Sequence, residues 1–66
     1  MMRKVVNEFS LGPYKVLALD GALPNRGYRE YIIDGRSFGI VPLYDVPDSI
    51  AIESKDSFIG KTVEFK

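Results

Sequence analysis

The chain has no cysteine and no histidine. Without cysteine it cannot form disulfides or carry out thiol chemistry. Without histidine it lacks the commonest general base, and a zinc site would have to be built from carboxylates alone, which zinc rarely accepts. The sequence therefore predicts a non-enzymatic protein with no catalytic residue, no cofactor and no metal site.

Long apolar runs, blocks of like charge and low-complexity segments are also missing. The N-terminal MMRKVVNEF is positively charged, but no apolar stretch follows it, so no secretory signal and no membrane span are predicted. A composition of 45% hydrophobic and 27% charged residues is typical of a folded domain rather than of a disordered chain. We expect a cytoplasmic protein that does not contact a membrane.

The chain is short, with 66 residues. This length allows one domain, which we place at residues 1–66. So small a domain buries only about 60% of the surface of its unfolded chain, and here neither disulfides nor a metal can add stability. Tight packing or self-association must supply it instead.

Short alternating segments bounded by turn residues predict β-strands along most of the chain. In residues 3–11 the alternation places Val5, Asn7, Phe9 and Leu11 on one side of the strand. Residues 14–20 are apolar on both faces, which indicates a central strand, with a helix within residues 14–24 as the alternative. Further strands are expected at 49–53 and 61–66, with these side chains inward: Ile50, Ile52, Val63 and Phe65. Between them, Phe58 and Ile59 are expected to close one end of the core.

Residues 28–44, YREYIIDGRSFGIVPLY, predict a β-hairpin whose register has two solutions. A two-residue type I′ turn at Asp34-Gly35 is the stronger turn signal. A turn displaced toward Arg36 instead puts Ile33 opposite Phe38. In this second register four apolar side chains share one face of the hairpin: Tyr31, Ile33, Phe38 and Ile40. Because a one-residue slip exchanges the two faces, the apolar pattern favours the second register.

These elements predict an all-β fold. We expect a small five- to six-stranded antiparallel barrel or highly curved sheet, SH3-like or OB-like in size, with at most one helical turn, at residues 44–49. Asp45 and Asp48 in that connection could form a carboxylate pair. Two carboxylates beside Pro47 are more simply explained as turn residues, because they offer too few oxygens for calcium. An enzyme would require a site assembled between subunits.

Aromatic and basic side chains near the hairpin suggest a binding surface. Candidate binding residues outside the predicted core are Arg26, Tyr28, Arg29, Arg36 and Tyr44. One alternative is a small β-barrel that stacks single-stranded nucleic acid on tyrosines and contacts phosphates through arginines. Nine basic residues balance nine acidic ones, and this zero net charge disfavours nucleic acid.

A protein-interaction module requires fewer assumptions. Arginine and tyrosine dominate the energetics of protein interfaces, and so small a domain gains stability from a partner. The sequence thus favours a non-catalytic module that binds a protein partner or a second copy of itself, as a homo-oligomer or an accessory subunit.

Overall fold

The protein is described by a computed structural model that covers residues 1–24, 27–39, 41 and 46–66. Six strands form one antiparallel sheet in the order β4-β3-β6-β1-β2-β5. Their bounds are β1 (Met2–Leu11), β2 (Tyr14–Leu19), β3 (Glu30–Ile33), β4 (Arg36–Gly39), β5 (Ser49–Ile52) and β6 (Thr62–Phe65). The predicted all-β class and curved antiparallel sheet are confirmed. Residues 14–19, for which a helix was the alternative, form a strand between β1 and β5.

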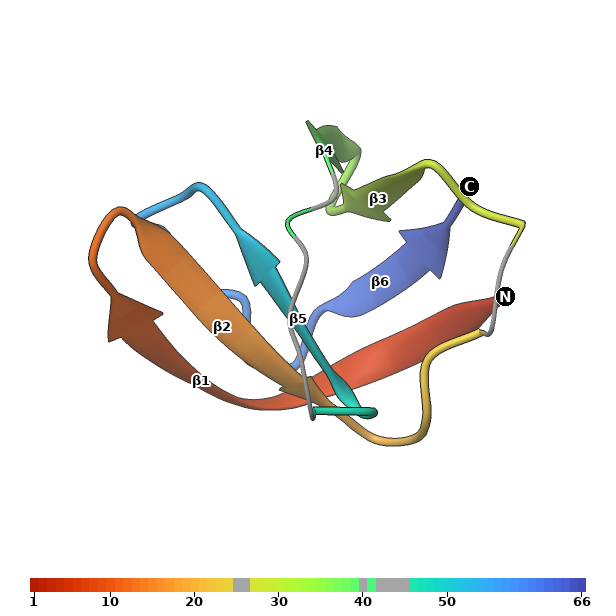
Figure 1. Ribbon diagram of the computed structural model, residues 1–66, viewed down its shortest axis with the longest axis horizontal. Helices are drawn as coiled ribbons and strands as arrows, with labels where there is room; N and C mark the ends of the chain where they lie inside the picture. Colours follow the sequence, from red (N-terminus) through yellow and green to blue (C-terminus); the bar gives the residue numbers. More distant parts are fainter. Residues whose placement is uncertain (25–26, 40, 42–45) are drawn as a thin grey trace.

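The long first strand is shared by two layers of the sheet (Figure 1). Its first part, Met2 to Lys4, pairs with β6, and its later part pairs with β2. Between Val5 and Asn7 the register shifts, so that Val6 is an extra residue and forms a β-bulge. Because a bulge bends its strand and increases the local twist, β1 can pass from one layer to the other and let the two layers face each other.

The bulge also exchanges the two faces of β1. Val5 lies in the core, but beyond the bulge Glu8 pairs with the buried Leu17 and points to the core side. Phe9 and Leu11 are exposed. The prediction that they share one face with Val5 is therefore wrong, because a strict two-residue alternation does not survive an inserted residue.

The core lies between the two layers and takes side chains from strands on both sides. Its buried members are Val5, Leu17, Leu19, Tyr31, Ile33, Ile50, Ile52, Phe58, Val63 and Phe65. The inward positions predicted for β5 and β6 are confirmed. Phe58 is buried as expected, whereas its neighbour Ile59 is exposed.

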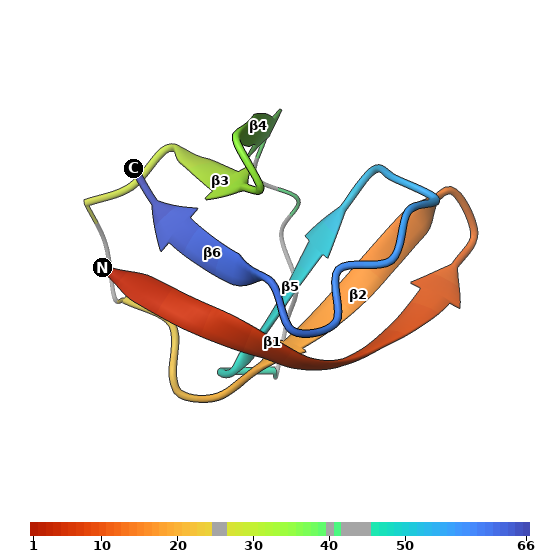
Figure 2. The same cartoon turned by 180° about the vertical axis from the view of Figure 1, so that it is seen from behind.

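The sheet is not closed into a barrel by a continuous ladder. Within the described residues, the link between the end strands is a single antiparallel bridge between Val41 and Ala51. Figure 2 shows the connection between β5 and β6 crossing the β1–β2 hairpin, where the Phe58 N–H donates a hydrogen bond to Glu8. Side-chain and loop contacts therefore complete the core where strand pairing ends.

The hairpin of β3 and β4 has the two-residue turn. Ile33 pairs with Arg36 and Tyr31 with Phe38, so the predicted pairing of Ile33 with Phe38 is wrong. Asp34 and Gly35 have φ angles of 53° and 78°, as a type I′ turn requires. The apolar pattern misled because the local turn fixed the register and placed Arg36 opposite Ile33. The Arg36 side chain stays 53% exposed, with its guanidinium 5.1 Å from the centre of the Phe38 ring.

This turn makes a specific prediction about two glycines. A Cβ added at Gly35 or at Gly39 would meet no atom within 4 Å, but only Gly35 has a positive φ. Gly35→Ala is therefore expected to lower the free energy of unfolding by about 1 kcal/mol through backbone strain alone. Gly39→Ala is the matched control and should leave stability unchanged or slightly raised. Urea denaturation followed by circular dichroism measures both, and equal effects would contradict the type I′ turn.

Candidate functional site

The predicted binding residues do not form one surface in the described part of the chain. Arg26 and Tyr44 lie outside the described residues, as does the predicted core residue Ile40. Tyr28 was expected to point outward, but its ring packs against Phe65 and Tyr31 at centroid distances of 5.2 Å and 5.9 Å. Because that contact covers much of the ring, Tyr28 extends the core.

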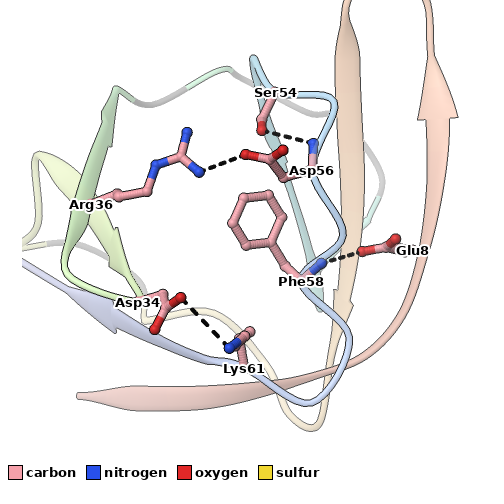
Figure 3. A network of polar contacts seen from close by, with 7 residues as sticks. All are labelled: Glu8, Asp34, Arg36, Ser54, Asp56, Phe58 and Lys61. Carbon is pink, nitrogen blue, oxygen red and sulfur yellow. Dashed lines mark hydrogen bonds and ion pairs between the residues drawn. The ribbon is translucent and has the colours of Figure 1, made fainter.

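Arg29 and Arg36 differ in what surrounds them. Arg29 is exposed, and its backbone N–H donates to the carbonyl of Lys66. Arg36 Nη1 donates to Asp56 Oδ2 at 2.6 Å, and its guanidinium lies 5.9 Å from the centre of the Phe58 ring (Figure 3). Both arginines of the predicted set are exposed, and Arg36 is in addition held by its ion pair with Asp56.

Arg36 belongs to a set of contacts that fastens the β3–β4 hairpin to the β5–β6 connection. The rings of Phe38 and Phe58 meet edge to face at 5.7 Å. On the same side, Lys61 Nζ lies 3.5 Å from Asp34 Oδ2 (Figure 3). Both ion pairs are largely exposed to solvent, so each contributes at most about 1 kcal/mol, and the aromatic contact is the stronger part. This arrangement fits a structural role.

Glu8 anchors the same connection from the other side. Its Oε1 accepts a hydrogen bond from the Phe58 N–H at 2.7 Å, and its Oε2 lies 3.7 Å from Lys15 Nζ. The hydrogen bond from the Phe58 backbone is the main reason that the pKa of Glu8 lies below its usual value, and it outweighs the opposing effect of burial. A carboxylate held ionised in this way positions a loop and is poorly suited to act as a general acid.

A different surface stands out on the side of β1, β2 and β5 that faces away from the core. Directly paired residues of antiparallel strands share a face, so the register places Phe9 beside Val16, Val16 beside Ala51, and Ala51 beside Val41. We call this side the uncharged face. Its members are Val6, Asn7, Phe9, Leu11, Tyr14, Val16, Ala18, Val41, Ser49 and Ala51.

The most exposed part of the uncharged face is a line of apolar side chains along β1. Val6, Phe9 and Leu11 are 55%, 58% and 55% exposed. Val16, Ser49 and Ala51 on the same face are buried within the chain although none belongs to the core cluster, so the accessible part of the face is the line along β1. The one amide of this line, on Asn7, is occupied locally, because its Oδ1 accepts a hydrogen bond from the Glu8 N–H.

The outer side of the other layer provides a contrast within the same molecule. Its register brings together Met2, Lys4, Ile32, Ser37, Thr62 and Glu64. We call it the polar face, and its mixture of charged and hydroxyl groups is what an antiparallel sheet normally presents to water. Within the bounds of β1, β2 and β5 the other side carries no charged residue, and the exposed Glu53 follows just beyond the end of β5.

Sequence reasoning missed the uncharged face because it depends on the bulge. With uninterrupted alternation, Phe9 and Leu11 appeared to continue the core side begun by Val5. The sequence did contain one signal against uninterrupted alternation. That alternation leaves Glu8 and Ser10 as the outward residues of β1 after Val6, although the neighbouring strand β2 is apolar on both faces. A strand apolar on both faces needs a covering on each side.

Other chemistry finds little support in the described residues. Within residues 1–24, 27–39, 41 and 46–66, no three acidic side chains gather as a metal site would require. Asp48 is exposed, and its partner in the predicted carboxylate pair, Asp45, lies outside the described residues. The same part of the chain has no helix long and apolar enough to span a membrane.

Comparison with known proteins finds no family model that matches the chain, and no curated protein or solved structure with significant similarity to it.

Proposed function

We propose that the protein is a non-catalytic protein-interaction module that docks through the exposed β1 line of the uncharged face. The observation that carries this proposal is the line of Val6, Phe9 and Leu11 along β1, three large apolar side chains that are each more than half exposed. Exposed apolar side chains that lie together mark interaction sites more often than single ones do. The cytoplasm stays the predicted location.

The strand supporting this line is well held, which favours recognition over disorder. Phe9 pairs with Val16 in the ladder between β1 and β2, which holds its backbone, whereas the pairs with β6 lie at Met2 to Lys4. A backbone held in this way loses little further freedom when a partner binds, and this lowers the ordering cost of binding. A central aromatic flanked by aliphatic side chains is also the usual composition of an interface centre.

The alternative of single-stranded nucleic acid draws less support from the geometry. Of its predicted contacts, Arg36 is paired with Asp56 and Tyr28 packs on Phe65. The uncharged face offers no cation for a phosphate, and phosphate contacts supply most of the affinity of such binders. A protein surface is the partner that an apolar, uncharged sheet suits best.

A photo-crosslinking amino acid placed at position 9 tests the proposal in cells that express the protein. We expect covalent protein adducts from position 9 and few from position 32, because Ile32 is an apolar residue on the polar face. Mass spectrometry identifies the adduct, and the purified partner should then bind Phe9→Ser about ten-fold or more weakly than the wild type. Equal labelling from both positions, or no protein adduct from position 9, would reject the docking face.

A further inference from the structure

We infer that the Asp34-Gly35 turn is a site of spontaneous backbone modification, at which Asp34 converts to isoaspartate through a cyclic imide. This turn lies apart from the uncharged face, so the inference does not depend on the proposed function. The chain contains the Asp-Gly pair twice, at Asp34-Gly35 and at Asp20-Gly21. Glycine puts no side chain in the way of ring closure, so the dipeptide alone would make both pairs equally reactive.

The reaction joins the side chain of Asp34 to the next backbone nitrogen. The Gly35 nitrogen attacks Cγ of the protonated carboxyl, a Cγ–N bond forms, and the Cγ–OH bond breaks. The hydroxyl leaves as water together with the amide proton, which leaves a cyclic imide. Water then opens the imide at one of its two carbonyl carbons. Opening at Cγ restores aspartate, whereas opening at the main-chain carbonyl carbon breaks its bond to the Gly35 nitrogen and leaves isoaspartate.

The backbone of Asp34 is already close to the conformation that ring closure needs. The imide brings Cβ and the Gly35 nitrogen together about the Cα–C bond, which for an L-residue requires a ψ of about −120°, as at the first central residue of a type II′ turn. Type I′ and type II′ turns share a positive φ at that residue, and Asp34 has a φ of 53°. Only the peptide between Asp34 and Gly35 must flip, and glycine accepts the negative φ that results.

That flip breaks no hydrogen bond within the described residues. Neither the Asp34 carbonyl nor the Gly35 N–H takes part in one, because strand pairing ends at Ile33 and Arg36. The space beside the turn is open, since a Cβ added at Gly35 would meet no atom within 4 Å. The Asp34 side chain is 64% exposed, and its ion pair with Lys61 Nζ is 3.5 Å long. The peptide can therefore turn over while both strands stay paired.

Asp20-Gly21 is the same dipeptide in a restrained setting. Asp20 Oδ1 accepts a hydrogen bond from the Lys4 N–H at 3.1 Å, and the Asp20 N–H donates to the Lys4 carbonyl at 2.9 Å. A Cβ added at Gly21 would lie 3.0 Å from Arg3 Nε, so the Arg3 side chain covers this backbone. Asp20 also lacks the positive φ of Asp34. Ring closure at Asp20 must disturb these contacts, so the fold protects one pair and leaves the other open.

Isoaspartate at position 34 would lengthen the turn. Its main chain runs through the side-chain carbon atoms, which adds one backbone atom between Ile33 and Arg36. The two-residue turn fits the twist of its strands closely, so a longer turn should splay the β3–β4 hairpin. The carboxylate also moves from the side chain to the main chain and leaves its place beside Lys61. We expect the modified protein to show shifted amide signals in residues 30–39 and unchanged ones in β2.

Incubation of the folded protein in mildly acidic buffer, which keeps part of the carboxyl protonated, tests the inference. Peptide mapping by mass spectrometry should find the imide, lighter by one water, and isoaspartate at position 34. Their formation should be at least about ten-fold faster than at position 20, where a hydrogen bond and a packing contact must break. In concentrated urea the two positions should react at similar rates. Asp34→Glu is the matched variant, because its longer side chain closes a ring poorly, and it should remove the product at position 34 while position 20 reacts as before.

Other results would overturn the inference. Equal rates at the two positions of the folded protein, or a faster reaction at position 20, would show that the turn gives no advantage. The absence of product at position 34 would exclude the modification itself. A preference for position 34 that persists unchanged in urea would assign the difference to neighbouring residues and reject the structural argument.

Discussion

Phe58→Ala is expected to lower the free energy of unfolding by about 3–5 kcal/mol, the usual cost of truncating a buried phenylalanine. Phe58 is 3% exposed and is the core side chain that the β5–β6 connection supplies in the described structure. Its ring also supports Phe38 and underlies Arg36. Because a chain of this size has only about 3–10 kcal/mol of stability in total, much of the variant should be unfolded at 25 °C.

Urea denaturation and the dispersion of the amide spectrum measure this effect. Ile59→Ala is the matched control, since it truncates the next residue of the same connection, which is 55% exposed. The control should change stability by no more than about 0.5 kcal/mol. Similar small losses in both variants would show that Phe58 does not complete the core.

The free energy of unfolding should fall at high pH because of the phenol of Tyr31. Tyr31 is buried, and burial is the main reason that its pKa rises from the ordinary 10.0 to about 12. Its phenol must therefore stay neutral in the folded chain, whereas the unfolded chain can ionise it from about pH 10 upward. The stabilisation is fully present below pH 10 and is lost as the pH rises through the interval to about 12.

Comparison with Tyr31→Phe isolates this contribution. The variant keeps the ring that packs edge to face on Phe65 at 5.6 Å, and it has no phenol to ionise. Denaturation curves between pH 9 and pH 12 should show the wild type losing stability more steeply than the variant across the interval from 10 to about 12. Parallel curves would mean that the phenol reaches solvent in the folded state.

Local patterns were enough to predict several elements of the fold. Alternation in residues 49–53 and 61–66 placed Ile50, Ile52, Val63 and Phe65 inside, because one face of each strand is consistently apolar. The Asp34-Gly35 pair predicted the type I′ turn that the hairpin has. The prediction failed where a global apolar pattern was preferred to that local signal, since an arginine can occupy the position opposite Ile33 by lying over an aromatic ring while it stays exposed.

The candidate site could not be predicted in the same way. Tyr28 and Arg36 have the composition of binding residues, but whether such side chains bind a partner or pack internally depends on what lies opposite them in space. Tyr28 meets Phe65, and Arg36 meets Asp56 and Phe58, all far away along the chain. Their contacts exist only after the hairpin has docked on the remaining strands.

The sequence by itself determined that this is an all-β protein without disulfides, with short strands whose alternation selects the core. These properties depend on neighbouring residues, and a two-residue period is legible without knowing the fold. The tertiary structure decided which side of β1 faces water. One extra residue, Val6, reverses the alternation, and only pairing with β2 and β6 shows that it is extra. Phe9 and Leu11 therefore lie outside, because the strand bends there to serve both layers.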